Sequence, residues 1–302
     1  MLIALDIGGN RLHLHGPDHL SCLAWPLQPF DRFIQPTRAI KADITAVIEV
    51  CSHLPTHSRE ALRYDALEGL WQLYDGQDGY VFESADPLTA GTRTCATISP
   101  DFSHMRVWTL PHSSILGRGW VPMHVINPLL EVCLLTKLGR DGGWLLHAAG
   151  VISEAGGFIF TGASGTGKST LSEWFSSQGA QVFSDERVIV KQVSGEFTLW
   201  GTPWPGSGRH SQNRTAPLTQ VFCIRHGEAS HQINKLAHRR LYQLLLNQSF
   251  LPVWDHAALM GVVSSIGKLI DSHSCHELAF LNQADVVPYI QKHALSRDSS
   301  RA

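Results

Sequence analysis

A glycine-rich stretch in the middle of the chain carries the clearest chemistry of this sequence. Residues 162–169, GASGTGKS, fit the pattern G-x-x-x-x-G-K-[ST] without a gap. An apolar run that favours a strand precedes them, and an amphipathic run that favours a helix follows. In that setting, glycines let successive backbone N–H groups converge on one anion, and the helix N-terminus adds partial positive charge. We therefore predict a loop that binds the phosphates of a nucleoside triphosphate.

Each position of this loop has an expected role. Lys168 is expected to reach the β- and γ-phosphates, and the Ser169 hydroxyl is expected to bind Mg²⁺. Further nucleotide contacts are expected along the rest of the loop, from Gly162, Ala163, Ser164, Gly165, Thr166, Gly167 and Thr170. A chance glycine-rich turn is the alternative, and the flanking strand and helix argue against it.

Two acidic residues follow one helix later. Asp185 and Glu186 come at the end of a short apolar strand, QVF. A carboxylate there can hold Mg²⁺, directly or through water, or accept the proton of an attacking hydroxyl. The alternative is a strand-end turn with solvated acids. Because the phosphate loop lies just upstream, we interpret both acids as metal ligands and Asp185 as the proton acceptor.

A histidine precedes the loop on a separate predicted strand. The run WLLHAAGVI contains His147, and the turn SEAGG connects it to the strand before the loop. If these strands pair antiparallel, His147 lies near the loop and faces the γ-phosphate or Asp185. It could then orient the acid, share its proton or contact the transferred phosphate. A core histidine bonded to a backbone carbonyl fits the sequence equally well.

A second polar loop is a candidate for ligand contacts. Residues 201–210, GTPWPGSGRH, are rich in glycine and proline and lie between predicted strands. Trp204 could stack on a ligand, and Arg209 or Arg214 could neutralise a transferring phosphate. A surface loop with solvated arginines is equally consistent with the sequence.

The elements that position these residues divide the chain near residue 125. Residues 1–125 contain short alternating or aromatic runs, and residues 70–83 predict a β-hairpin. Residues 126–295 alternate predicted helices and strands, starting with a helix at Asn127–Pro128. The polar residues 296–302 predict a disordered tail. The sequence thus predicts an α/β fold, in which a small β-rich domain precedes a mixed-sheet domain with the phosphate loop.

Composition narrows the classes of function. The chain has 302 residues, of which 43% are hydrophobic and 17% charged, and a formal net charge of −2. It has no basic stripe for nucleic acid, no polybasic cluster for a membrane surface and no apolar run of about 18 residues. Its 6 cysteines never form C-x-x-C, which is typical of reduced thiols. These features predict a cytoplasmic protein without nucleic-acid or membrane partners. A Ras-type GTPase is disfavoured, because Asn234–Lys235 does not continue as the guanine-binding Asn-Lys-x-Asp.

The chain has a distinctive order of features: His147, strand, glycine turn, strand, GASGTGKST, helix and SDE. This order resembles that of the HPr kinase/phosphorylase family. It is also similar to the phosphate-binding core of phosphoenolpyruvate carboxykinases, which share that fold. The resemblance implies that Lys168 and Ser169 handle phosphates and metal. It matches Asp185 and Glu186 to the family's acidic pair, and His147 to the histidine thought to work with those acids.

The resemblance covers residues 140–190 well and extends more loosely to about residue 290. The family usually has Asp-Asp where this chain has Asp185–Glu186, and residues 201–210 replace its glycine-rich signature. These departures leave phosphorolysis, and HPr as the acceptor, open. The chain looks more like divergent HPr-kinase-like proteins of peptide-modification gene sets, some of which phosphorylate a serine of a small peptide.

We therefore expect an ATP- and Mg²⁺-dependent kinase that transfers the γ-phosphate to a hydroxyl of a protein or small peptide, most simply a serine. Asp185, assisted by His147, would take the hydroxyl proton, and Lys168 would neutralise developing charge. The alternatives are a nucleotide-gated binding module without phosphotransfer and a small-molecule kinase. The resemblance also leaves a homo-oligomer open.

Overall fold

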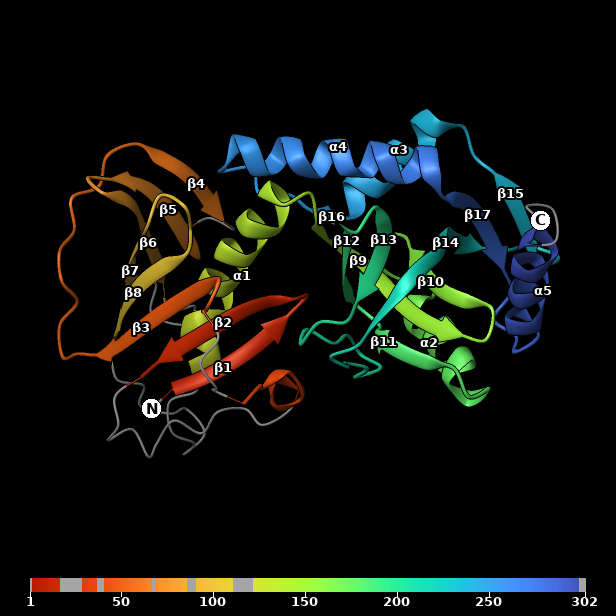
Figure 1. Ribbon diagram of the computed structural model, residues 1–302, viewed down its shortest axis with the longest axis horizontal. Helices are drawn as coiled ribbons and strands as arrows, with labels where there is room; N and C mark the ends of the chain where they lie inside the picture. The colour runs from red at the N-terminus through yellow and green to blue at the C-terminus, as the bar shows by residue number, and fades with distance from the viewer. Residues whose placement is uncertain are drawn as a thin grey trace. The chain divides into compact units, whose positions relative to one another are not determined.

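The computed structural model describes residues 2–16, 29–36, 41–66, 69–85, 91–110 and 122–298 as a mixed α/β protein (Figure 1). The chain divides into two compact units. The first comprises Met1–Lys137 and Pro252–Ala258, and the second comprises Leu138–Leu251 and Leu259–Ala302. None of the helices in the described ranges is long and apolar enough to cross a membrane.

The first unit contains a sheet of 8 strands in the order β1-β2-β3-β8-β7-β6-β5-β4. Strand β3 is parallel to β2 and β8, and the other neighbours are antiparallel. The strands are β1 (Leu2–Ile7), β2 (Asn10–His15), β3 (Ile44–Val50), β4 (Leu62–Ala66), β5 (Trp71–Gly76), β6 (Gly79–Ala85), β7 (Thr92–Ile98) and β8 (His104–Thr109), with a 3-10 helix at Phe30–Phe33.

The hairpin predicted within residues 70–83 is confirmed. Strands β5 and β6 pair antiparallel, and Gly76 pairs with Gly79 at the turn. Gly79 has a φ of +145°, and a Cβ there would lie 2.1 Å from the carbonyl oxygen of Ile98. Only glycine fits that position, because both its backbone conformation and its surroundings exclude a side chain.

The first unit includes a segment from much later in the chain. The indole N–H of Trp254 donates to the Thr136 hydroxyl at 2.8 Å. Its ring lies edge-on to Tyr64 and Trp71, with centroid distances of 5.4 and 5.7 Å. Trp254 is buried by these contacts. This aromatic cluster joins the segment Pro252–Ala258 to the first unit, and no sequence pattern indicated it.

Two predicted boundaries differ from the structure. Helix α1 (Pro122–Arg140) begins before the predicted start at Asn127, so that Pro128 lies inside it. Pro122 takes the first helical position, where a missing N–H costs nothing. The predicted tail of residues 296–302 overlaps helix α5 (Val286–Asp298), and residues 299–302 lie outside the described residues.

The second unit contains a 9-stranded mixed sheet, which follows the order β10-β9-β12-β13-β14-β17-β15, with β11 and β16 also paired to β9. The strands are β9 (Trp144–Ser153), β10 (Gly156–Thr161), β11 (Gln181–Ser184), β12 (Arg187–Val193), β13 (Glu196–Trp200), β14 (Thr215–His226), β15 (Gln232–Lys235), β16 (Ser249–Phe250) and β17 (Ser274–Phe280). Its helices are α2 (Lys168–Ser177), α3 (His238–Gln248), α4 (His256–Ser272) and α5.

Side chains of this sheet alternate between two hydrophobic clusters. On β9, Leu146 and Ala148 join the cluster that includes α3 and α4 residues, whereas Ala149 and Val151 join the cluster that includes α2 and α5 residues. The second unit therefore has three layers, with helices on both faces of the sheet. His147 shares the α2 face of β9 with Ala149, since both positions have the same parity.

Strand β9 changes its partners at His147. Residues Trp144–His147 pair with β12, and residues Ala148–Ser153 pair with β10. Because β10 also pairs with β14, the ladder from β9 through β12, β13, β14 and β10 returns to β9. This closed path of hydrogen-bonded strands gives the residues near His147 a rigid base.

An aromatic cluster supports the strand and helix on either side of the phosphate loop. Phe160 stacks on Phe222 at a centroid distance of 5.5 Å and lies 5.3 Å from Phe175 of α2. These rings are fully buried. Their packing fixes the end of β10 relative to the start of α2, where the loop must hold its shape.

We expect Phe160→Ala to lower the free energy of unfolding by about 3–5 kcal/mol, because it removes a buried ring and leaves a cavity. Val193→Ala is the control, since Val193 is 42% exposed and its truncation should change this free energy by less than about 0.5 kcal/mol. Urea unfolding followed by circular dichroism measures both. Equal losses in the two variants would contradict the assigned core.

Candidate functional site

The glycine-rich loop connects β10 to α2, so that the predicted strand and helix flank it. Gly167 is the N-cap of α2 with a φ of +98°, and no side chain caps the helix there. A Cβ on Gly167 would lie 2.8 Å from Cζ of Phe280. The first-turn amides of α2 therefore lack a side-chain acceptor, as an anion-binding helix N-terminus requires.

Lys168 is folded back into this loop. Its ammonium donates to the carbonyl oxygens of Gly162 at 2.8 Å and Ala163 at 3.2 Å. Only 6% of the residue is exposed. Burial lowers the pKa of Lys168, and the nearby Glu186 carboxylate opposes that shift. The loop thus carries a cation that is hydrogen-bonded to its own carbonyls and that an incoming phosphate can attract.

His147 lies beside the loop strand, as the predicted antiparallel pairing requires. Ala148 pairs with Thr161, and the Thr161 hydroxyl donates to the His147 carbonyl at 2.9 Å. The imidazole Nε2 lies 3.2 Å from Oε1 of Glu186. The sequence led us to expect His147 against the γ-phosphate or Asp185, but its carboxylate partner is Glu186. The Asp185 carboxylate is bonded instead to the backbone amides of Gly206 and Gly208.

The electrostatic surroundings of His147 favour its neutral form. Burial lowers the pKa of the imidazole, and the positive charge of Lys168 lowers it further. Glu186 and a hydrogen bond with Gln248 oppose this shift. A neutral imidazole beside a carboxylate can take up a proton, which a protonated one cannot.

Asp185 has a different environment from Glu186. Its carboxylate is fully buried. Oδ1 accepts the backbone N–H of Gly206 at 2.9 Å, and Oδ2 accepts that of Gly208 at 2.6 Å. Charge-assisted bonds of this kind are strong. Asp185 therefore holds the tip of the 201–210 loop, in place of the contact with His147 that the sequence suggested.

The same loop contacts the phosphate loop and its helix. The Ser207 hydroxyl donates to the Ser169 hydroxyl at 3.3 Å, and Nε2 of His210 lies 2.9 Å from Oε1 of Glu173. Arg209 is exposed and has a φ of +58°, an uncommon conformation for a residue with a side chain. The 201–210 loop therefore lies against the site and presents a cation beside it.

Trp204 and Arg214, the other two predicted ligand contacts of this segment, differ in their exposure. Trp204 is buried, with 7% exposed, so that it packs in the protein and offers no open face for stacking. Arg214 is exposed, and its carbonyl accepts the N–H of Gly201 at 2.9 Å. Sequence reasoning missed Ser207, although its Gly-Ser-Gly setting was a usable signal for a backbone held close to other groups.

The oxygen donors near the loop suit Mg²⁺, which prefers hydroxyl, carboxylate and phosphate oxygens. Ser169, Asp185 and Glu186 all lie in this region, as the contacts above show. In the described part of the chain, however, no group of three or more His, Cys, Asp or Glu side chains could hold a metal by itself. One hydroxyl and two carboxylates are ligand types that suit Mg²⁺ bound together with a nucleotide.

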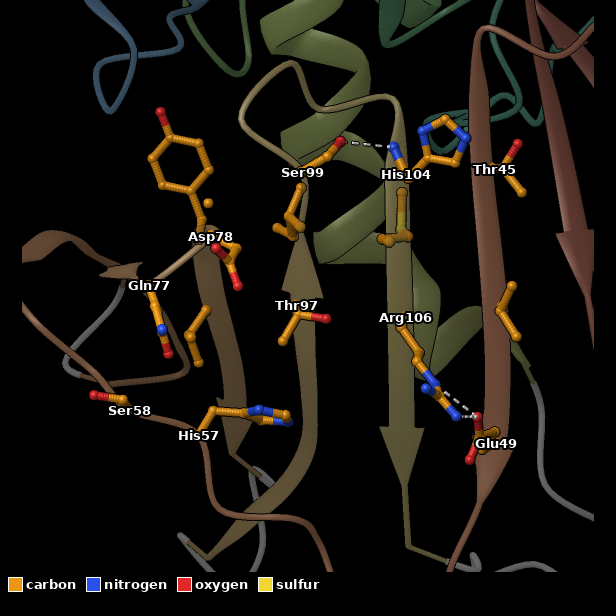
Figure 2. Close-up of a pocket in the computed structure, with 17 residues that line it drawn as sticks. Thr45, Glu49, His57, Ser58, Gln77, Asp78, Thr97, Ser99, His104 and Arg106 are labelled. Atoms are coloured by element: carbon orange, nitrogen blue, oxygen red, sulfur yellow. Dashed lines mark hydrogen bonds and ion pairs between the residues drawn. The ribbon is translucent and has the colours of Figure 1, made fainter.

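A separate hollow of about 630 Å³ lies on the sheet of the first unit. Figure 2 shows its walls on β3, β6, β7 and β8. Arg106 and Glu49 form an ion pair of 2.7 Å within it, and Val47 contributes an apolar side chain that is 41% exposed. Its volume is in the usual range for small-ligand sites.

No family model matches the chain, and no curated protein matches it. Among solved structures, the chain is similar to the Hpr(Ser) kinase/phosphatase from Coxiella burnetii, with 12% sequence identity and a TM-score of 0.30. The match covers 52% of this chain and 97% of that one. The relationship is a distant structural one.

We expect Lys168→Ala to raise the pKa of His147 and Glu186→Gln to lower it, because the lysine charge disfavours imidazolium and the carboxylate favours it. In the unaltered chain this pKa should lie below the usual value for a histidine. NMR titration of the imidazole nitrogens measures it. Lys235→Ala, which removes an exposed lysine of β15, is the control and should leave it unchanged. A fall with Lys168→Ala would contradict the assigned proximity.

Gly167→Ala is expected to abolish binding of MgATP, because its Cβ would collide with Phe280 and distort the loop. Gly179→Ala is the matched control, with a φ of +85° and open space around its Cβ. Each change should cost about 1–2 kcal/mol of stability through backbone strain. Isothermal titration calorimetry measures the affinity of each variant for MgATP. Equal affinity in both variants would contradict a nucleotide site at this loop.

Proposed function

We propose that this chain is an ATP-dependent kinase that transfers the γ-phosphate to a serine hydroxyl of a protein or small peptide. One observation carries the proposal. A phosphate loop with a buried lysine, a carboxylate–histidine pair and a glycine-rich loop converge on one place in the second unit. Phosphoryl transfer needs charge neutralisation, a proton acceptor and positioning, and these groups supply the three together.

The phosphate loop would bind and orient the triphosphate. Its backbone amides and the start of α2 offer donors for phosphate oxygens, and Lys168 would leave the carbonyls of Gly162 and Ala163 to meet them. Mg²⁺, when bound with the nucleotide, would bridge phosphate oxygens and neutralise developing charge. The Ser169 hydroxyl and the neighbouring acids are the residues that would hold it.

We assign the acceptance of the hydroxyl proton to Glu186, in place of Asp185. Glu186 is 39% exposed at its side chain and has His147 at 3.2 Å, so that both substrate and a second proton-binding group can reach it. Asp185 is fully buried and bonded to two amides. Its role would be to hold the 201–210 loop.

We infer the class of acceptor from the sequence resemblance, because it includes proteins that phosphorylate a serine of a small peptide. Asp185–Glu186 and the altered glycine-rich segment distinguish this chain from the usual pattern, so we propose a protein or small peptide other than HPr as the acceptor. A small-molecule acceptor is the alternative within the same chemistry.

A second candidate function is a nucleotide-gated binding module, in which ATP changes the loops and the first unit holds a partner. The hollow of about 630 Å³ favours this alternative, because a built concavity in the other unit has no part in the phosphate chemistry (Figure 2). The two functions differ in one respect, which is whether phosphate is transferred.

The decisive experiment incubates the purified chain with Mg²⁺ and γ-labelled ATP in an extract of its own host. We expect labelled protein or peptide, loss of label with Lys168→Ala, and a decrease of about 100-fold or more with Glu186→Gln. Glu196→Gln is the control, because Glu196 is exposed on β13 and should retain full activity. ATP binding by each variant is measured in parallel.

Each result of this experiment points to one function. Label on a small molecule would retain the kinase and replace the peptide acceptor. Absence of transferred label, with ATP still bound, would overturn the kinase in favour of the binding module. Full activity of Glu186→Gln together with loss in Asp185→Asn would return the proton-accepting role to Asp185.

A further inference from the structure

The tip of the 201–210 loop is fixed from several directions. Its base is joined to the core, where the N–H of Gln212 donates to Phe183 at 2.9 Å and the Thr202 hydroxyl donates to the Arg187 carbonyl at 2.7 Å. At the tip, the Asp185 carboxylate holds the amides of the glycines on both sides of Ser207. The backbone of Ser207 is thus held in place while its hydroxyl remains exposed.

The glycines at this tip are required by the close approach of the acids. A Cβ on Gly206 would lie 2.9 Å from Oδ2 of Asp185 and 3.0 Å from Oε2 of Glu186. A Cβ on Gly208 would lie 2.8 Å from Oδ2 of Asp185. A Cβ at either position would force an acid side chain to shift, so the loop backbone lies close against both acids. Glu186 is therefore a neighbour of the Ser207 segment.

The Ser207 hydroxyl lies close to groups that phosphoryl transfer would use. It donates to the Ser169 hydroxyl, which follows Lys168 in the phosphate loop, at 3.3 Å. Glu186, which is paired with His147, lies against Gly206, the residue before Ser207. An exposed hydroxyl bonded to the phosphate loop, with a proton acceptor close by in the same loop contact, is a candidate nucleophile.

We propose that Ser207 is itself a phosphorylation site, modified by the same chain from bound ATP. This inference rests on the proposed function. The Ser207 oxygen forms a bond to the γ-phosphorus, and the bond from that phosphorus to the β,γ-bridging oxygen breaks. The bridging oxygen keeps the electron pair and leaves as part of ADP. The hydroxyl proton passes to the Glu186 carboxylate, so that atoms and charges balance.

The surroundings of Ser207 also explain what the modification does. A phosphate there carries nearly two negative charges at neutral pH. The neighbouring carboxylates of Asp185 and Glu186 repel it. Phosphorylation therefore weakens the hold of Asp185 on the tip and moves the loop away from the acids. The place beside Ser169 is then open to an acceptor from outside the chain.

The test uses the full-length purified chain with Mg²⁺ and ATP and no other protein. Intact-mass measurement is expected to show one added phosphoryl group, and tandem mass spectrometry is expected to assign it to Ser207. Its rate should not change with protein concentration, because the transfer is intramolecular. Ser207→Ala should lose the modification, and Ser230→Ala, which removes another exposed serine of the same unit, should retain it.

Parallel measurements separate this inference from the proposed function. Transfer of label to an acceptor in host extract by a chain whose Ser207 remains unmodified would overturn the inference and leave the kinase intact. Modification of Ser207 in Lys168→Ala, or a rate proportional to protein concentration, would overturn self-modification within one chain. Absence of transfer to any acceptor, with ATP bound, would overturn both. Circular dichroism of Ser207→Ala verifies that it folds, and site assignment in the unaltered chain does not depend on that variant.

Discussion

The carboxylate of Asp185 accepts two backbone N–H groups from a loop that begins 16 residues after it in the chain, and the arrangement of the second unit's site depends on these bonds. A buried carboxylate without partners would be costly, and the glycine amides offset that cost. In return, the carboxylate fixes a polar loop against the phosphate loop. Together with the contacts of Ser207 with Ser169 and of His210 with Glu173, it positions this loop against the phosphate loop and α2.

The site combines a rigid base with loops that can be exchanged. The closed path of strands and the aromatic cluster around Phe160 hold β9, β10 and the start of α2. The phosphate loop and the 201–210 loop then contribute the polar groups. In sites of this kind, a change in loop sequence can alter which ligand is bound, because the unchanged scaffold still positions the side chains that the loops carry. The departures of residues 201–210 from the resembled family lie in the part that would meet the acceptor.

The two acids illustrate how adjacent residues acquire different functions. Asp185 and Glu186 follow one another, yet one is fully buried among amides and the other is partly exposed beside His147. The carbonyl of Glu186 accepts the N–H of Ala148 at 3.0 Å, which continues the pairing along β9 through this turn. The two side chains nevertheless have different partners, because Asp185 accepts the amides of Gly206 and Gly208 whereas Glu186 contacts His147. Under the proposed function, Glu186 takes part in the chemistry and Asp185 organises the loop.

The sequence by itself determined the strand, loop and helix of the phosphate site, because glycine spacing and hydrophobic periodicity are local properties. It also determined the hairpin at residues 70–83 and the antiparallel placement of His147 beside the loop strand. Only the tertiary structure decided which acid His147 meets, that Asp185 holds Gly206 and Gly208, and that Ser207 reaches Ser169. It likewise decided that Trp254 packs with Tyr64 and Trp71. These contacts join residues far apart in the chain. Their pairing depends on the strand order, on the side to which each side chain points and on the path of the loop. A local sequence pattern encodes none of these three.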